Sequence, residues 1–181
     1  MNDFEHILLT IAKQAIQEVL ENKTLINKAD LVEQFPLLLN SQATFVTLNS
    51  EGKLRGCIGS LIAYQTLIDD LISNAKNAAF KDPRFPPLTK EEFKKVDIEV
   101  SILSTPTKVN FSSIKDLKSQ VQVEVDGLII KQNNLQGTFL PQVWEQLPTF
   151  ELFLEHLFAK ANITDISQGF EIYKYQVKKI K

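Results

Sequence analysis

Apolar residues recur at the spacing of an α-helix in three parts of the chain. In the first, polar residues separate apolar ones three or four positions apart, which describes an amphipathic helix with Asp3 as its N-cap. Its expected inward-facing residues are Phe4, Ile7, Leu8, Ile11, Ala12, Ala15 and Val19. Two further helices are expected over residues 66–80 and about 149–161, and the prolines after Lys81 end the earlier of these two.

Alternation of apolar and polar residues, the pattern of a half-buried strand, marks a second set of segments. Residues 44–48 and 54–59 flank a turn that contains Gly52 and are predicted to form a β-hairpin. Further strands are expected at residues 97–103, 121–125, 128–130, 136–140 and 170–177. We also expect residues 35–40 to cross the core without a regular helix and residues 116–120 to form a short helical turn.

The order of hairpin and then helix occurs twice, over residues 45–80 and 128–161. Helices separated by antiparallel strand pairs predict an α+β fold with a mixed or antiparallel sheet, rather than a doubly wound parallel sheet. No stretch rich in proline, glycine and serine divides the chain, so one compact body is expected.

Composition narrows the functional classes. Twenty Lys and Arg against 22 Asp and Glu give a net charge of −2, so the chain as a whole does not attract nucleic acid or an anionic membrane. Cys57 is the single cysteine, which excludes an internal disulfide and a cysteine-rich zinc site and fits a reducing compartment. The first residues lack a signal-peptide pattern, and no apolar run approaches the roughly 20 residues that span a bilayer, so a cytoplasmic protein without a membrane partner is expected.

Residues 54–59, Leu-Arg-Gly-Cys-Ile-Gly, place a guanidinium and a thiol together. Alternation sends Arg55 and Cys57 to one face of the strand, while Gly56 and Gly59 indicate a bulge or a close approach of another backbone or a ligand. In one interpretation Cys57 is a small buried apolar residue at a corner of the sheet. In the other, Arg55 binds an anion and favours the thiolate form of Cys57.

Other residues bear on this choice. Nucleophilic catalysis by Cys57 needs a nearby base, but His6 and His156, the only imidazoles, lie in predicted helices on faces open to solvent. One cysteine and two unrelated histidines also predict no metal site. Arg55 is therefore a better candidate for anion binding than Cys57 is for a nucleophile.

A proline-rich segment, residues 82–87, carries the second candidate cluster. Its prolines fix a rigid loop that could hold Asp82 and Arg84 in defined directions toward a ligand. The alternative is a loop that stops a helix, in which Asp82 pairs with Arg84 or caps a neighbouring segment. Farther along the chain, Phe139 and Trp144 are expected in the core, because large aromatic side chains dominate packing.

These clusters together resemble the AMMECR domain family. The resemblance rests on LRGCIG at residues 54–59, DPRFPP at residues 82–87, VDGL at residues 125–128 and TFLPQVWEQ at residues 138–146. Gly137, before the last motif, departs from the alanine or serine expected there.

The resemblance implies one domain, residues 1–181, with two βα lobes of approximately residues 1–95 and 96–181 and no flexible linker. The lobes would share a mostly antiparallel, barrel-like sheet with helices packed outside. Relatives are associated with a Memo-like protein and a radical S-adenosylmethionine protein, as the first component of the AmmeMemoRadiSam system. By position, the family's hallmark segment points to Arg55, Gly56, Cys57 and Gly59 as the functional surface, with Arg84 and Asp82 beside it.

Three functional hypotheses follow. In the first, the protein is an accessory or substrate-binding component that holds a small anionic ligand near Arg55 and Arg84 while its partners supply the chemistry. In the second, it is a stand-alone enzyme that uses the Cys57 thiolate. In the third, it is an RNA-binding module that uses the arginines and exposed aromatic residues. No cofactor of its own is expected, since the chain lacks the cysteine motif of a radical cluster.

Overall fold

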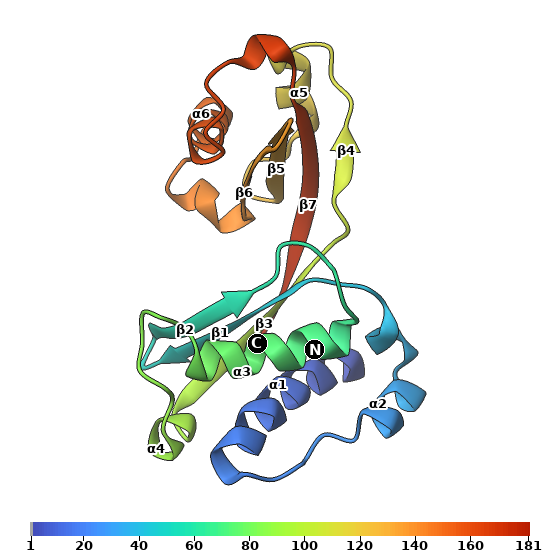
Figure 1. The fold of residues 1–181 in the computed structure, drawn as a ribbon, viewed down its shortest axis with the longest axis vertical. Helices are drawn as coiled ribbons and strands as arrows, with labels where there is room; N and C mark the ends of the chain where they lie inside the picture. Colours follow the sequence, from blue (N-terminus) through green and yellow to red (C-terminus); the bar gives the residue numbers. More distant parts are fainter. Residues whose placement is uncertain (1) are drawn as a thin grey trace. The chain divides into compact units, whose positions relative to one another are not determined.

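The computed structural model describes residues 2–181, and their packing divides them into two units. The first unit extends to Leu103 and also includes Lys178–Lys181, and the second is Ser104–Val177. Each unit combines helices with antiparallel strands, which confirms the predicted α+β class (Figure 1).

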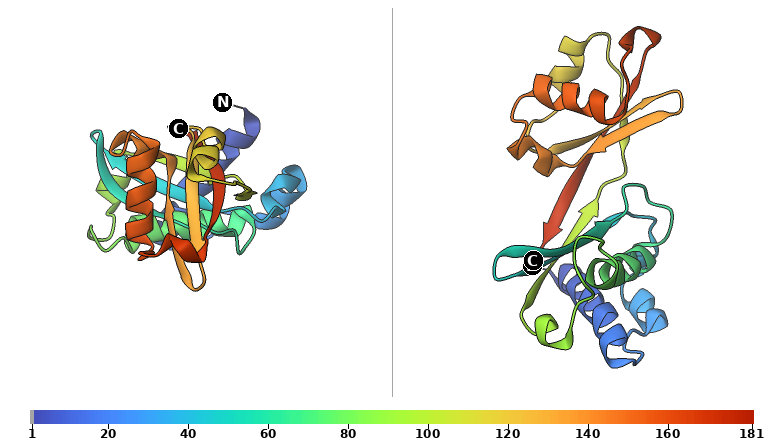
Figure 2. Two further views of the ribbon diagram at one scale, coloured as in Figure 1. Left: turned by 90° about the horizontal axis from the view of Figure 1, so that it is seen from above. Right: turned by 60° about the vertical axis from the view of Figure 1, so that its left-hand side comes forward.

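The first unit is a small antiparallel sheet with helices on one face. Its strands, in spatial order, are β2 (Lys53–Gly59), β1 (Thr44–Ser50) and β3 (Val96–Leu103). Its helices are α1 (Asp3–Glu21), α2 (Lys28–Gln34), the 3-10 helix η1 (Pro36–Leu39), α3 (Leu67–Phe80) and α4 (Lys90–Phe93). The long helices α1 and α3 pack together under the sheet and bury its apolar face (Figures 1 and 2). β2 is the edge strand of this three-stranded set, so its outer backbone groups need other partners.

The second unit has its own core. Its strands, in spatial order, are β4 (Thr107–Val109), β7 (Glu171–Ile180), whose last three residues belong to the first unit, β5 (Asp126–Gln132) and β6 (Leu135–Phe139). Its helices are α5 (Ile114–Gln120), η2 (Pro141–Glu145), α6 (Phe150–Lys160) and η3 (Ile166–Gln168). Trp144 is buried and stacks on Phe153 with ring centroids 3.6 Å apart, which confirms its predicted place in the core.

The ends and faces of α1 correct two predictions. Asn2, not Asp3, is the N-cap: its side chain accepts a hydrogen bond from the Glu5 amide, and the Glu5 carboxylate accepts one from the Asn2 amide. This capping box satisfies two free amides at once, which Asp3 inside the helix cannot do. Val19 is 48% exposed rather than inward-facing, and in that turn of the helix Leu20 packs against the core instead.

The predicted strand at residues 121–125 is also wrong. The chain turns there, with Glu124 at a φ of 69° and the Val125 and Asp126 amides both donating to the Gln122 carbonyl. The Asp126 carboxylate closes the turn by accepting from the Gln122 amide at 2.9 Å. Alternating valines therefore did not form a strand, because a local hydrogen-bonded turn ends the extended conformation before β5 begins.

Candidate functional site

β2 carries residues 54–59, and its register explains where their side chains point. Cys57 lies opposite Thr47 of β1, whereas Gly56 lies opposite Leu48. The pairing slips between Leu48 and Asn49, so Arg55 is an extra residue on β2 and forms a bulge. A Cβ atom on Gly56 would lie 2.2 Å from the Ala78 carbonyl oxygen of α3. Gly56 therefore faces the helix layer, and Cys57 faces the opposite side of the sheet, as alternation predicts.

Arg55 is held by a carboxylate from a distant part of the sequence. Its Nε and Nη2 atoms donate to the two oxygens of Glu92 at 2.9 and 3.1 Å, and Nη2 also donates to the Pro86 carbonyl at 2.9 Å. The hydrogen bonds from Arg55 are the main reason that the pKa of Glu92 falls to about 2. Both groups are thus ionised at neutral pH. The Arg55 charge is neutralised inside the protein, which the sequence did not predict.

Asp82 and Arg84 clamp the backbone of Cys57. The buried Asp82 carboxylate accepts from the Cys57 amide at 2.8 Å, and Arg84 Nη2 donates to the Cys57 carbonyl at 3.2 Å. Arg84 also binds both Asp82 oxygens, at 2.9 and 2.7 Å. The free edge of β2 at Cys57 is therefore paired with a side-chain ion pair in place of another strand.

The clamp fixes the charge states of its two members. Hydrogen bonds from Arg84, more than any other cause, hold the pKa of Asp82 far below its ordinary range, and those same bonds raise the pKa of Arg84. The pairing of Asp82 with Arg84, which is the alternative to ligand binding for this loop, is present in the structure, and the Asp82 carboxylate also accepts from the Cys57 amide in the middle of β2. This local pairing does not remove the functional interpretation, because the Arg84 side chain is still 53% exposed.

Phe85 lies between the two guanidinium groups. The Arg55 and Arg84 Cζ atoms are 5.7 and 5.6 Å from the centre of its ring, within the range of cation–π attraction. The segment 82–87 thereby connects both arginines to one rigid loop. We call the surface made by β2 and this loop the β2 surface.

Cys57 is half-buried, and its thiol makes one hydrogen-bond contact among the described residues. Its Sγ atom lies 3.3 Å from Thr47 Oγ1, and Glu99 of β3 lies opposite Thr47 on the far side of β1. The Glu99 carboxylate binds Lys181 at 2.7 Å. His6 and His156 are exposed on α1 and α6, as predicted, and neither takes part in the β2 surface. Within residues 2–181 no group of His, Cys, Asp and Glu could hold a metal ion.

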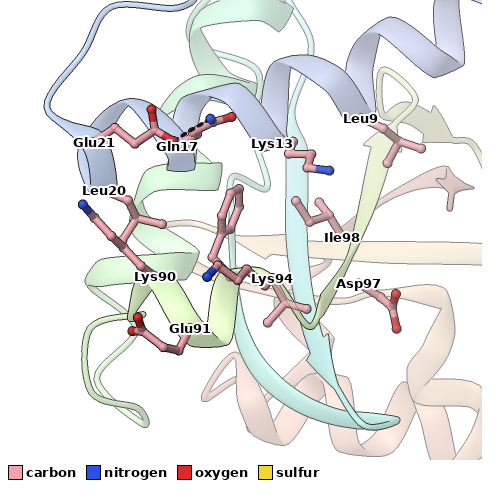
Figure 3. A pocket seen from close by; sticks show the side chains of 12 residues that line it. Leu9, Lys13, Gln17, Leu20, Glu21, Lys90, Glu91, Lys94, Asp97 and Ile98 are labelled. Carbon is pink, nitrogen blue, oxygen red and sulfur yellow. Dashed lines mark hydrogen bonds between the residues drawn. The ribbon is translucent and has the colours of Figure 1, made fainter.

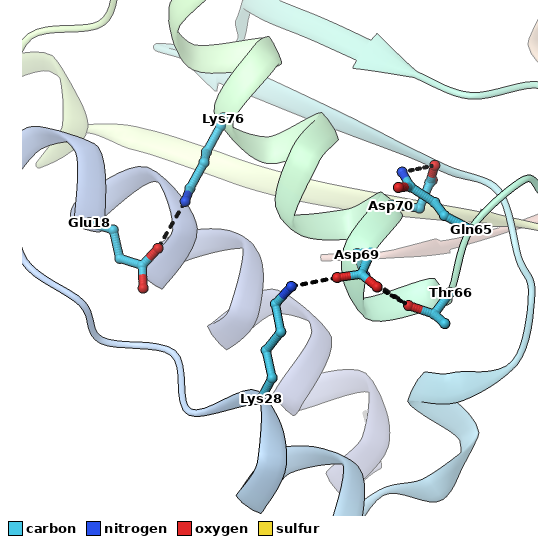
Figure 4. A network of polar contacts seen from close by, with 7 residues as sticks. All are labelled: Glu18, Lys28, Gln65, Thr66, Asp69, Asp70 and Lys76. Atoms are coloured by element: carbon cyan, nitrogen blue, oxygen red, sulfur yellow. Dashed lines mark hydrogen bonds and ion pairs between the residues drawn. The ribbon is translucent and has the colours of Figure 1, made fainter.

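A buried carboxylate, Asp70, supports the end of β2, and Figure 4 shows its contact with Gln65. Asp70 of α3 is fully buried and accepts from the Ser60 hydroxyl at 2.7 Å, directly after Gly59. It also accepts from the amide and the hydroxyl of Thr44, both at 2.7 Å, and from the side chains of Gln65 and Asn74. These bonds tie α3 to the ends of β1 and β2, so the geometry of residues 54–59 depends on a residue outside the motif.

Sequence reasoning missed several members of this site. Glu92 could have been found in part, because Thr89 and Glu92 form the S/T-x-x-E pattern of a capping box, which the structure contains. The Glu92 partner, Arg55, lies 37 positions away and left no local signal. Thr47 and Asp70 are ordinary residues in their segments, and only the fold brings Thr47 beside Cys57 and places the buried Asp70 against the end of β2.

Comparison with known proteins gives consistent results. The family model described as AMMECR1 matches residues 9–180. A protein of Methanothermobacter thermautotrophicus is 43% identical over 137 residues, which cover 75% of this chain and 70% of that protein. Another, from Methanocaldococcus jannaschii, is 34% identical over 180 residues, covering 93% of this chain and 87% of that protein.

One solved structure resembles the whole chain. The crystal structure of an uncharacterised protein from Pyrococcus horikoshii superposes with a TM-score of 0.79 at 29% identity. The match covers 99% of this chain and 91% of that one. In addition, no helix within residues 2–181 has the length and apolar character needed to cross a membrane.

Proposed function

Because the chain belongs to the AMMECR1 family, we propose that it is an accessory or substrate-binding component that works with a Memo-like protein and a radical S-adenosylmethionine protein. In this proposal the β2 surface binds an acceptor group, such as a carboxylate, on a small ligand or on a partner. The partners supply the chemical step. The chain contributes the binding surface.

One observation carries the proposal. The Nη1 atom of Arg55 is buried and has no acceptor among the described residues, and it is the only such side-chain nitrogen or oxygen found there. A buried donor without a partner costs about 1–3 kcal/mol, so such a donor usually has an acceptor, which a water, a ligand or a partner can supply. An acceptor brought by a ligand or a partner would recover this free energy, which gives binding at Arg55 a physical reason.

The balance of charges on the β2 surface determines which kind of ligand it favours. Glu92 and Asp82 neutralise the two arginines, so the β2 surface has no strong field to attract a polyanion. This disfavours the RNA hypothesis, which needs several uncompensated cations along a groove. A single acceptor or carboxylate remains favourable, because the Arg84 side chain is still half-exposed and Arg55 Nη1 is unpaired.

The same contacts disfavour a stand-alone thiol enzyme. A general base for Cys57 must accept a proton near neutral pH. Glu92, with its pKa lowered to about 2, and Asp82, lower still, are poor bases. Glu99 already binds Lys181, and neither histidine belongs to the segments that form the β2 surface.

An apolar patch next to the end of β2 supports docking of a protein partner. Two loops meet there: Ser41 and Thr66 form a β-bridge, the Leu67 amide donates to the Asn40 carbonyl, and the Ser41 hydroxyl donates to the Ala63 carbonyl. The 3-10 helix η1 exposes Leu37 and Leu39, and the loop after β2 exposes Leu61, Ile62 and Tyr64. Exposed apolar side chains on neighbouring segments are typical of interaction sites. We call them the loop patch.

Binding to purified partners tests this proposal. We expect the chain to bind the Memo-like or the radical S-adenosylmethionine protein of the same organism in isothermal titration calorimetry. An Ile62→Ser, Tyr64→Ser double variant should weaken that binding at least about tenfold, because aromatic and apolar anchors dominate interface energies.

A matched control comes from the second unit. Leu135 is 39% exposed near the tip of the β5–β6 hairpin, so Leu135→Ser removes a similar apolar area elsewhere. It should leave the affinity within about twofold. If the chain binds neither of the two partners, the proposal is refuted. If the double variant and Leu135→Ser weaken the binding equally, the loop patch is not the docking site.

A further inference from the structure

A groove in the first unit lies away from the β2 surface. It has a volume of about 750 Å³ and lies between α1, α4 and the start of β3 (Figure 3). This volume is within the range of about 300–1,000 Å³ typical of small-molecule sites. Its apolar lining consists of half-buried side chains: Leu9, Leu20, Phe93, Val96 and Ile98. None of its lining residues belongs to the β2 surface or to the loop patch.

Two lysines in the groove have no anionic partner. Lys13 comes from α1 and Lys94 from the end of α4, on opposite walls (Figure 3). Neither makes an ion pair or a side-chain hydrogen bond with any described residue, whereas ten other basic residues do form ion pairs. Lys90, the third lysine of the lining, likewise makes no ion pair among the described residues; the hydrogen bond from Gln17 is the main cause that lowers the pKa of Glu21, and the charge of Lys90 adds to it.

The acidic residues of the lining lie around these lysines rather than between them. In Figure 3, Glu21, Glu91 and Asp97 are at the margins of the group, and Lys13 and Lys94 lie nearer its middle. Glu21 is already bound, because its carboxylate accepts from the Gln17 side chain at 2.7 Å. The middle of the groove therefore combines free positive charge with apolar walls.

We propose that this groove binds a small organic anion with an apolar body, such as an aromatic carboxylate. The apolar body lies against Phe93, Val96 and Ile98, and the carboxylate is held between the ammonium groups of Lys13 and Lys94. The apolar body of the ligand is removed from water when it lies against the apolar wall. The charge-assisted contact of its carboxylate with the lysines orients the molecule. The proposal is independent of any role of the β2 surface.

A matched pair of probes tests the charge requirement. 1-Naphthaleneacetate and its neutral amide have the same ring and nearly the same shape, and both can be titrated into the full chain by calorimetry and amide NMR. We expect the acetate to bind about tenfold tighter than the amide, with chemical-shift changes at the groove lining. A Lys13→Gln, Lys94→Gln double variant should reduce the acetate affinity to that of the amide.

The same titrations include a control variant and give the results that would contradict the proposal. Lys115→Gln removes an exposed lysine of the second unit and should change neither affinity. Equal affinities of acetate and amide in the unsubstituted protein would overturn the proposal. So would shift changes confined to residues outside the groove, or no binding of the acetate at all.

Discussion

A Gly56→Ala substitution is expected to lower the free energy of unfolding by about 3 kcal/mol or more, measured by urea denaturation. The added Cβ atom would lie 2.2 Å from the Ala78 carbonyl oxygen. The obstacle is a helix backbone, which cannot turn aside as a side chain can. The sheet and α3 must separate locally, and the close packing that buries the apolar face of β1 is lost with them.

A second glycine of the same hairpin provides the control. Gly52 has a φ of +74° in the turn, and a Cβ atom there would meet no other atom within 4 Å. Gly52→Ala should therefore cost only the backbone strain, about 1 kcal/mol. If both substitutions destabilise the protein equally, the close approach of β2 and α3 at Gly56 is not the determining contact.

An Asp70→Ala substitution is the second change with a large expected effect, again about 3 kcal/mol or more. It removes the acceptor of five hydrogen bonds, from the Thr44 amide and hydroxyl and from the side chains of Ser60, Gln65 and Asn74. Thr44 and Asn74 are buried, so their donors cannot recover the lost bonds from bulk water. Urea unfolding measures the loss.

A substitution of the neighbouring residue, Asp69, distinguishes the effect of losing a buried carboxylate from the effect of losing a negative charge (Figure 4). Asp69 is also in the first turn of α3, but its side chain is 41% exposed and pairs with Lys28. Asp69→Ala should cost less than about 1 kcal/mol, since exposed ion pairs contribute little. Similar losses for Asp69 and Asp70 would show that the buried network is not what stabilises this end of the sheet.

The fold class was predictable because its signals are local and agree with each other. Helical spacing fixed α1, α3 and α6, and a glycine-containing turn between alternating segments fixed the β1–β2 hairpin. Prediction failed where a local hydrogen bond outweighed the pattern, as at Gln122 and Asp126, where a turn replaced the expected strand. The cap at Asn2 was missed because Asp3 is an equally good capping residue by type.

The sequence predicted which segments form the candidate site, but it did not predict that the charge of Arg55 is neutralised. Residues 54–59 and 82–87 do come together, as their unusual composition suggested. Arg55 as a free anion-binding group was an inference from one segment alone. In the fold, Glu92 pairs with Arg55. This contact joins residues 37 positions apart, so neither the local pattern nor the spacing of residues predicts it. Glu92 balances the charge of Arg55, so only the buried Nη1 donor of Arg55 is left without an acceptor.

This change also alters what the β2 surface can recognise. The two ion pairs balance their charges internally, but Arg55 Nη1 is buried, so an acceptor reaches it only when the groups that cover it move. Recognition then depends on shape and on single hydrogen bonds, which suits a specific protein partner or a small ligand better than a polyanion. The loop patch beside the end of β2 adds the apolar contact that such a partner requires.

The most direct test of this account uses the single cysteine as a reporter. Cys57 is half-buried in the middle of the β2 surface, so alkylation by iodoacetamide, followed by mass spectrometry, reports the access to that surface alone. We predict that a saturating amount of the Memo-like or radical S-adenosylmethionine partner slows the alkylation at least about tenfold. An unchanged rate in a complex that has formed would contradict the claim that the partners bind at the β2 surface.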